Sequence, residues 1–309
     1  MSDQKNLRGQ AIVITGASSG IGRGTALKLA ELGANVVLAA RRGQVLHELA
    51  AQITAEGGTA VPVETDVSVP EDIARLADAA VDRFGRIDVW INNVGIAAIG
   101  RFWDTPVEVH ARVIDVNVNG LLYGAHAALR QFRAQGAGVL VNVGSVESEV
   151  PLAYQSSYAA SKSAVLSLSR CLNEELRLAG DSETIKVGTI MPWAVDTPFW
   201  THTANYTGHA PRMAAMDDPD VVVDAIVAAC TDPKEEQPVG AKAHATNISH
   251  RFLPDLTERL GAKISDSETA KGSPRPDTSG SIFEPMEEGA TVDGGIRERM
   301  KREDAPPHP

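Results

Sequence analysis

The sequence predicts an α/β fold with a single doubly wound, Rossmann-type parallel sheet of about seven strands, covered by helices on both faces. Two observations lead to this prediction. Short runs of apolar and β-branched residues alternate with longer segments of helical periodicity up to about residue 192. The apolar runs are continuous, which is typical of strands buried on both faces. Such an alternation requires right-handed crossovers between parallel strands and therefore indicates a doubly wound sheet.

Six short apolar runs account for most of the predicted sheet. They are residues 10–15, 35–40, 59–64, 86–92, 138–144 and 185–190. The segments between them carry apolar residues at helical spacing, as in residues 71–84. Residues 217–232 form one further amphipathic segment, and residues 237–245 are expected to form the last strand. Together these elements define a predicted domain over residues 1–262.

The remaining residues, 263–309, are rich in serine, proline, glycine and charged side chains. A segment of this composition buries too little apolar surface to order itself. We therefore expect a polar and flexible C-terminal extension. The pair Ile282 and Phe283 is an apolar spot within it.

The overall charge is acidic, with 29 Lys and Arg against 40 Asp and Glu and a net charge of −11. This argues against a nucleic-acid partner, because such binding depends on neutralising phosphates. No apolar run approaches the roughly 20 residues that span a bilayer, so no membrane partner is expected. Cys171 and Cys230 lie in apolar helical segments, which indicates buried packing rather than a disulfide or a metal site. We expect a reduced, cytoplasmic protein without a bound metal.

A glycine-rich loop follows the first predicted strand and opens the first helix. In "TGASSGIG", the residues Gly16, Gly20 and Gly22 allow a tight turn and the close approach of a phosphate to the backbone. The helix that follows points its free N–H groups at the anion. The loop therefore predicts a site for the pyrophosphate of a dinucleotide.

The end of the second strand indicates which dinucleotide is bound. Folds that bind NAD usually place an acidic residue there, on the ribose 2′-hydroxyl. This chain has Ala40, Arg41 and Arg42 instead. Guanidinium groups suit a 2′-phosphate, so NADP(H) is favoured and NAD(H) stays possible. Asp66, after the third strand, either bonds the adenine amino group or caps the next helix.

These and several further motifs resemble the classical short-chain dehydrogenase/reductase family over about residues 7–245. "TGASSGIG" is similar to the cofactor loop of the family, and "NNVG" (92–95) resembles its NNAG motif. The resemblance implies that Asn117, Ser145, Tyr158 and Lys162 are catalytic. It also implies a set of cofactor-binding residues: Gly16, Ser18, Ser19, Gly20, Ile21, Gly22, Arg41, Arg42, Asp66, Val67, Asn93, Gly95, Tyr158, Lys162, Pro192, Val195 and Thr197.

The residue types agree with proton transfer. Tyr158 and Lys162 are four residues apart and share one helix face. An ammonium one turn away should lower the pKa of Tyr158 from its usual value of about 10, so that it acts as general acid or base. The Ser145 hydroxyl would hold the substrate oxygen, and Asn117 would hold a water of a proton relay. We expect an NADP(H)-dependent oxidoreductase that transfers a hydride between nicotinamide and a small-molecule carbonyl or alcohol.

The segment after Pro192 departs from the family pattern, because Trp193 stands where a glycine is usual. A bulky residue there should narrow the space beside the nicotinamide. We expect residues 193–216 to form a lid, and we take as candidate substrate contacts Glu147, Tyr154, Trp193, Phe199, Trp200 and Tyr206. Packing onto the core is an equally good explanation for the aromatic residues. A solvated loop is the alternative for Glu147 and Glu149, whereas a carboxylate facing the pocket would suit a cationic or polyhydroxyl substrate.

Other functions of the same fold stay open. The chain is compatible with an NAD(P)-binding sensor or assembly protein with little turnover, although the intact catalytic set argues against that alternative. An NAD(H)-preferring dehydrogenase, an epimerase and a dehydratase are further alternatives. The resembling family builds its subunit contacts on the helices expected here at about 105–134 and 153–179. A homodimer or homotetramer is expected on that basis.

Overall fold

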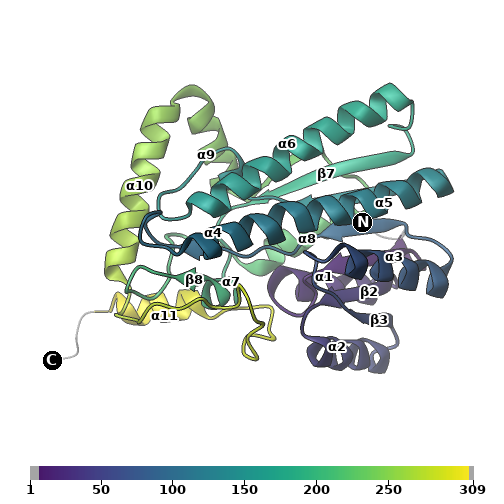
Figure 1. Cartoon of the computed structure of the whole chain (residues 1–309), viewed down its shortest axis with the longest axis horizontal. Helices are drawn as coiled ribbons and strands as arrows, with labels where there is room; N and C mark the ends of the chain where they lie inside the picture. Colours follow the sequence, from purple (N-terminus) through teal and green to yellow (C-terminus); the bar gives the residue numbers. More distant parts are fainter. Residues whose placement is uncertain (1–6, 306–309) are drawn as a thin grey trace.

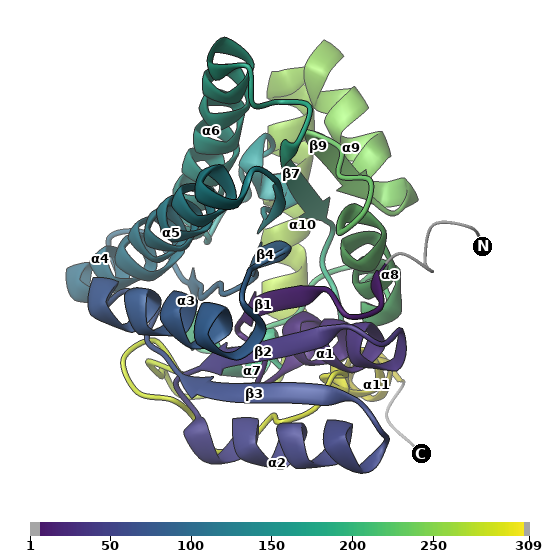
Figure 2. The same cartoon turned by 90° about the vertical axis from the view of Figure 1, so that its right-hand side faces the viewer.

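The computed structural model describes residues 7–305, and its centre is a seven-stranded parallel sheet (Figures 1 and 2). The strand order is β3-β2-β1-β4-β6-β7-β9. The strands are β1 Ala11–Thr15, β2 Asn35–Ala40, β3 Thr59–Glu64, β4 Val89–Asn92, β6 Gly138–Val143, β7 Ile185–Pro192 and β9 Glu236–Val239. The predicted doubly wound fold is confirmed. The order reverses between β1 and β4, which is where open α/β sheets bind ligands.

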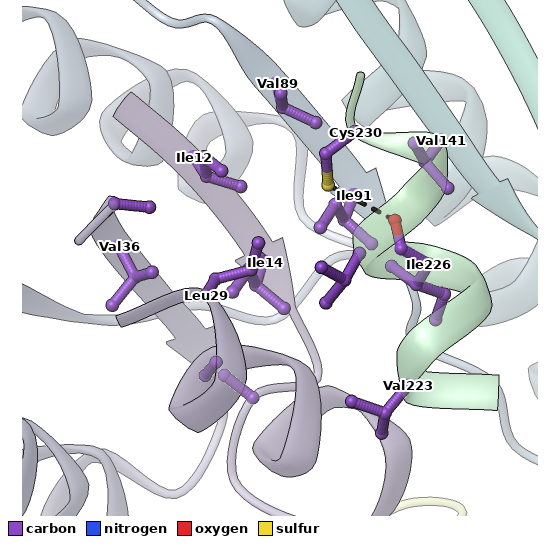
Figure 3. Close-up of a cluster of buried hydrophobic side chains, with 14 of the residues drawn as sticks. Ile12, Ile14, Leu29, Val36, Val89, Ile91, Val141, Val223, Ile226 and Cys230 are labelled. Atoms are coloured by element: carbon purple, nitrogen blue, oxygen red, sulfur yellow. Dashed lines mark hydrogen bonds between the residues drawn. The ribbon is translucent and has the colours of Figure 1, made fainter. Parts of the chain in front are cut away.

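The side chains of alternate strand residues pack into two separate hydrophobic cores, one on each face of the sheet. Ile12 and Ile14 of β1 pack on the face covered by α1 Gly20–Glu31, α2 Gly43–Ala55 and α8 Pro219–Ala229 (Figure 3). Val13, between them, packs on the opposite face with residues of three other helices: α3 Pro70–Phe84, α5 Gly120–Gln135 and α6 Ser156–Ala179. Burial on both faces explains why the strands read as continuous apolar runs.

The two cysteines differ in their surroundings. Cys230 is buried beside α8 and its thiol contacts the Ile226 carbonyl oxygen at 3.3 Å (Figure 3). Cys171 is exposed on α6, so the expectation of buried packing was wrong for this residue. It lies on the solvent side of a helix that is only partly covered.

The predicted helix at 105–134 is interrupted. It consists of α4 Val107–Ile114, a π-helical turn at Asp115–Asn119 and α5. A π turn inserts an extra residue per turn and occurs frequently at functional sites. Asn117 lies in this turn.

The segment expected to act as a lid, residues 193–216, is attached to the rest of the domain. It contains the short helix α7 Phe199–His202 and the strand β8 Ala204–Asn205. β8 pairs in parallel with β5 Ala98–Ile99, which follows β4. On its other side, Asn205 forms an antiparallel bridge with Thr278.

The last strand is shorter than predicted. β9 ends at Val239 instead of continuing to residue 245. Gly240 follows with a φ of +86°, and α9 Ala241–Phe252 begins directly after it. The alanine-rich sequence after Gly240 has a high helix propensity, which explains the early end of the strand.

The C-terminal segment differs most from the prediction. Instead of a flexible extension, residues 263–305 form the second half of α10 Pro254–Lys271, a long connection and α11 Ile296–Glu303, all packed on the domain. Ile282 and Ile296 are buried in the domain's own clusters. The composition correctly indicates that this segment lacks a core of its own, but it cannot indicate docking on an existing core.

A buried ion-pair network fastens the two C-terminal helices. The Arg212 side chain is 1% exposed and pairs with Glu268 of α10, Glu303 of α11 and Asp304. Within residues 7–305, none of the helices is long and apolar enough to cross a membrane. The same residues contain no cluster of side chains suited to a metal ion.

Candidate active site

A cleft opens at the carboxyl ends of the central strands, at the reversal between β1 and β4. Four loops line it: residues 16–21 after β1, 93–97 after β4, 143–147 after β6 and 192–197 after β7. Tyr158 and Lys162 of α6 close its floor. The sheet topology therefore brings together predicted residues that lie far apart in the sequence.

The glycine loop has the geometry that a pyrophosphate requires. Gly16 has a φ of +73°, which favours glycine. A Cβ on Gly22 would lie 2.3 Å from the Gly16 carbonyl oxygen, so that only glycine fits. α1 begins at Gly20, and the N-terminus of a helix favours an anion. These features fit a dinucleotide, as predicted.

The adenosine end of the cleft is partly taken by the C-terminal segment. Arg41 donates hydrogen bonds to the carbonyl oxygens of Ser281 at 2.6 Å and Phe283 at 2.8 Å. Arg42 donates to the carbonyl oxygens of Met286 and Glu288 and also to Ser18 of the glycine loop. Both arginines line the cleft, and hydrogen bonds to the C-terminal segment already occupy part of their donors.

The other predicted residues at this end are Asp66 and Val67, and both line the cleft. Asp66 accepts from the Ser68 hydroxyl at 2.7 Å and from Arg112 at 2.8 Å. Burial opposes ionisation of Asp66, but the hydrogen bonds from Ser68 and the charge of Arg112 hold its pKa below the usual value. Both carboxylate oxygens therefore have partners within the protein.

Ser145, Tyr158 and Lys162 meet at the nicotinamide end. Lys162 is buried and donates from Nζ to the Val143 carbonyl oxygen at 2.8 Å, and its Nζ lies 5.6 Å from the Tyr158 ring centroid. Burial lowers the pKa of Lys162 to about 8, opposed by the charge of Glu147.

The expected lowering of the Tyr158 pKa does not occur. Burial and the nearby Glu147 carboxyl raise the pKa of Tyr158 above its usual value, against the effect of a hydrogen bond with Ser145. Lys162 directs its ammonium group to a main-chain carbonyl rather than to the phenol. Tyr158 is therefore a protonated phenol at neutral pH, suited to donate a proton.

Asn117 has a positioning geometry. Its amide accepts from the Ile96 N–H at 2.9 Å and donates to the Ile96 carbonyl oxygen at 2.8 Å, and also to Ser161. The side chain thus fixes the loop after β4 and links it to α6. Its side-chain oxygen and nitrogen both have protein partners, so these hydrogen bonds do not support the expectation that Asn117 holds a water.

The loop after β4 supports the glycine loop. Asn93 links this loop to the end of β1, because its side-chain amide donates a hydrogen bond to the Thr15 carbonyl oxygen at 3.0 Å. A Cβ on Gly95 would lie 3.3 Å from the Lys162 Nζ, so glycine leaves room beside that ammonium. Pro192, Val195 and Thr197 line the opposite wall, as expected.

Glu147 is a buried carboxyl in the wall of the cleft. Its side chain has 5% exposure, and Oε2 has no hydrogen-bond partner among the described residues. Burial raises the pKa of Glu147 to about 8. Glu149, the other predicted alternative, instead pairs with Arg170 at 2.9 Å outside the cleft.

Three of the predicted aromatic residues line the cleft, namely Trp193, Phe199 and Trp200. The Phe199 ring lies 5.7 Å from the Tyr158 ring, centroid to centroid. Two others do not line it. The Tyr154 hydroxyl donates to Asp266 of α10. Tyr206 packs beside the cluster around Ala98. For these two residues, the packing alternative holds.

Several lining residues were not predicted. Met213 and Leu152 add to the apolar wall, and the C-terminal segment contributes Ser281, Pro285 and Met286. The apolar pair Ile282–Phe283 is the sequence signal that could have located this segment, because an isolated apolar spot in a polar stretch indicates docking.

Comparison with known proteins identifies the family. The family model described as short chain dehydrogenase matches residues 10–206. The uncharacterized oxidoreductase YxnA of Bacillus subtilis is 36% identical over 294 residues, which cover 94% of this chain and 80% of that protein. This alignment extends well into the C-terminal segment.

Solved structures agree with the fold. A short chain dehydrogenase/reductase from Burkholderia phymatum in complex with NAD is similar with a TM-score of 0.71 and 27% identity, over 86% of this chain and 99% of that one. An alcohol dehydrogenase from Thermococcus sibiricus complexed with 5-hydroxy-NADP is similar with a TM-score of 0.65 and 27% identity, over 74% of this chain and 95% of that one. The chain belongs to the short-chain dehydrogenase/reductase family of oxidoreductases.

Proposed function

We propose that this protein is an NADP(H)-dependent oxidoreductase that interconverts a small-molecule carbonyl compound and its alcohol, with Tyr158 as general acid and base. The observation that carries the proposal is the meeting of Ser145, Tyr158 and Lys162 at one end of a cleft whose other end is the glycine loop. A hydroxyl pair beside a buried ammonium suits a reaction in which charge develops on a carbonyl oxygen.

The cleft residues divide the work of holding the cofactor. The glycine loop would bind the pyrophosphate, Lys162 the nicotinamide ribose, and Pro192, Val195 and Thr197 the nicotinamide. Asn93 and Gly95 shape the middle of the cleft, while Asp66 and Val67 border the adenine. When bound, the nicotinamide supplies or accepts the hydride.

The protein's own groups handle the proton. In the reduction, Ser145 donates a hydrogen bond to the carbonyl oxygen and Tyr158 transfers its proton to that oxygen as negative charge develops. The raised pKa of Tyr158 keeps this proton in place at neutral pH. The Lys162 ammonium, whose Nζ lies 5.6 Å from the Tyr158 ring centroid, would then stabilise the phenolate until a proton returns.

A panel assay tests this function. NADPH oxidation is followed at neutral pH with aldehydes, ketones and quinones, and NADP⁺ reduction with the matching alcohols. Turnover of at least one class is expected. Tight NADPH binding without turnover of any compound would instead indicate a cofactor-binding protein without enzymatic function.

The preference for NADP(H) rests on Arg41 and Arg42 and on the lack of an acidic residue at the end of β2. The two similar solved structures hold one cofactor of each kind, so they do not decide it. Arg41→Ala should weaken NADPH binding about tenfold or more and leave NADH binding nearly unchanged, because a charged hydrogen bond contributes about 1.5–3 kcal/mol. Titration of both cofactors by fluorescence measures this, and equal losses would contradict a 2′-phosphate at Arg41.

We also expect a homodimer or homotetramer built on the helices α4–α5 and α6. Light scattering of the purified protein measures this directly. A monomer at micromolar concentration would contradict it.

A further inference from the structure

Glu147 is a buried group that the proton chemistry described above does not use. It follows Ser145 within one short 3-10 turn, Val146–Ser148, and its N–H donates to the Ser145 hydroxyl oxygen at 3.1 Å. The carboxyl and the substrate-binding hydroxyl are therefore held together on one rigid turn. A buried polar atom without a partner destabilises a protein, which makes an unpartnered carboxyl oxygen in a cleft wall a candidate ligand contact.

The surroundings of Glu147 restrict what can bind it. One side of its carboxyl is held by the N–H of Leu152, while Oε2 has no partner among the described residues. The lining of the cleft also includes the aromatic residues Trp193, Phe199 and Trp200. These apolar surfaces favour a ligand that carries a polar group for Glu147 on a mainly apolar compound.

A ligand could donate to Glu147 from an ammonium group or from a hydroxyl group, and the charge of Lys162 favours the hydroxyl. Its ammonium lies close enough to interact with Glu147, and both groups are buried. A substrate ammonium would be repelled by Lys162, whereas a neutral hydroxyl would not. A hydroxyl can also pair with Glu147 in either protonation state, as donor or as acceptor.

We propose that Glu147 binds a hydroxyl group one or two carbons from the reacting carbonyl, so that the substrates are hydroxycarbonyl compounds and the corresponding diols with an apolar remainder. Ser145 and Tyr158 hold the carbonyl oxygen, and Glu147 holds the second oxygen. This assignment rests on the proposed function for the reacting carbonyl. The second contact is a matter of binding and is measurable without turnover.

The test compares two ligands that differ by one hydroxyl, 1-phenyl-1,2-ethanediol and 1-phenylethanol. Their binding to the protein saturated with NADP⁺ is measured by calorimetry. Above pH 8, where the Glu147 carboxyl is ionised, the diol should bind about 10- to 100-fold more tightly, because hydrogen bonds to charged groups contribute about that much. Glu147→Leu should remove this advantage. Glu149→Leu, the matched change outside the cleft, should keep it.

Equal binding of the two ligands to the wild-type protein would overturn the proposal, as would an advantage that survives in Glu147→Leu. If Glu147→Leu does not fold, Glu147→Gln serves instead. In the wild-type protein the advantage should grow as pH rises through about 8, because a carboxylate is the stronger acceptor. In Glu147→Gln it should be independent of pH, and the same pH profile in both proteins would overturn the proposal. Turnover of either alcohol is scored separately and tests only the proposed function.

A second inference rests on a different observation, the connection between α10 and α11. We call residues 281–291 the strap. Figures 1 and 2 show it in yellow on the side of the molecule where α7, β2 and β3 lie. Before the strap, Thr278 pairs with Asn205 of β8, and after it the N–H groups of Ile296 and Arg297 donate to the Asp196 carboxylate. Both ends are therefore anchored while the middle crosses the cleft.

The strap occupies donors that phosphate groups would need. Four carbonyl oxygens, from Ser281, Phe283, Met286 and Glu288, accept from Arg41 and Arg42. A fifth, from Thr291, accepts from the Gly20 N–H at 2.7 Å, at the start of α1. A carbonyl oxygen and a phosphate oxygen compete for the same donors, so the strap and a 2′-phosphate cannot both use all of them.

We propose that the strap is an intramolecular competitor for the adenosine end of the cofactor site and that NADP(H) binding releases residues 281–288 from the arginine pair. This assignment also rests on the proposed function. Residues 281–288 should respond to the 2′-phosphate, which only NADP(H) carries. Thr291 should respond to the pyrophosphate, which both cofactors carry.

Hydrogen–deuterium exchange on the full chain tests this, with saturating NADP⁺, saturating NAD⁺ or neither. NADP⁺ should speed exchange in peptides covering residues 281–288 several-fold, and NAD⁺ should leave them nearly unchanged. Slower exchange with NADP⁺, or the same response to both cofactors, would overturn the proposal. Protection of residues 16–22 reports cofactor binding itself, and its lack with both cofactors would contradict the proposed function as well.

Discussion

The two ends of the cleft are built in opposite ways. At the end proposed for the nicotinamide, Ser145 lies in the turn after β6 and Tyr158 and Lys162 lie in α6, and Ser145 and Lys162 form hydrogen bonds with this turn and with β6. At the adenosine end, the arginines after β2 are bonded to carbonyl oxygens 240 residues or more away in the sequence. One end is arranged by the fold, and the other is shared with a segment that docks on it.

This difference suggests that proton transfer depends on one end of the cleft and the affinity for the cofactor on the other. The groups proposed to move a proton, Tyr158 and Lys162, are buried, and burial raises the pKa of Tyr158 and lowers the pKa of Lys162. The arginines proposed to bind phosphate already donate hydrogen bonds to the C-terminal segment. We therefore expect changes at the nicotinamide end to alter kcat, and changes at the adenosine end to alter the Kd of the cofactor.

The largest effect is expected for Tyr158→Phe. Loss of the hydroxyl removes the general acid, so kcat/KM should fall about 1000-fold, within the range that acid–base catalysis contributes. The Kd of NADPH should change less than threefold, because the ring and its packing on Phe199 stay. Steady-state kinetics with fluorescence titration measures both quantities. A large change in the Kd of NADPH would contradict the claim that changes at this end of the cleft alter kcat only.

The next effect is expected for Ile282→Ala, which tests how the strap is held. Ile282 is fully buried against Ala98, Val109 and Val113, and truncation of such a side chain costs about 2–4 kcal/mol. The strap should then exchange deuterium faster and NADP⁺ should bind more tightly, while kcat stays nearly constant. Hydrogen exchange and titration measure these changes.

Phe283→Ala is the matched control for that variant. Phe283 is adjacent to Ile282 but its side chain is exposed. Its truncation should leave exchange in the strap and the Kd of NADP⁺ unchanged. Equal effects of the two variants would show that the strap is not held through Ile282.

The last prediction concerns the pH dependence of stability. The pKa of Glu147 is about 8 in the folded protein, above the usual value of 4.5, so folding binds a proton between these pH values. The wild-type protein should lose stability as pH rises from 5 to 8, by at most about 1.4 kcal/mol per unit. Glu147→Gln should remove that part of the slope. Chemical denaturation at pH 5, 6.5 and 8 measures it, and parallel slopes would contradict the buried carboxyl.

Much of the fold was predictable because the determining signals are local. Continuous apolar runs such as residues 35–40 indicate strands covered on both faces, and Gly33, Gly57 and Gly85 end helices with positive φ values. The end of β9 was misplaced because an apolar run continues past Gly240 into a helix. The docked C-terminal segment was missed because docking depends on surfaces elsewhere in the chain.

The same limit applies to the site. The glycine loop and the residues Ser145, Tyr158 and Lys162 became candidates through motifs that resemble the family, and the structure places all of them along one cleft. The pKa of Tyr158 was predicted in the wrong direction because it depends on burial and on Glu147, and neither is visible from the spacing to Lys162. For Tyr154 and Tyr206, sequence alone could not decide between the cleft and packing.

The strap also has a consequence for the order of events during synthesis. Arg41 is made 240 residues before Ser281, its later partner. At about 5–20 residues per second, the arginines leave the ribosome roughly 10–50 s before the strap exists. During that interval the glycine loop and the arginine pair have no intramolecular competitor. The proposed competition for the arginine pair therefore begins only when the C-terminal segment has been made.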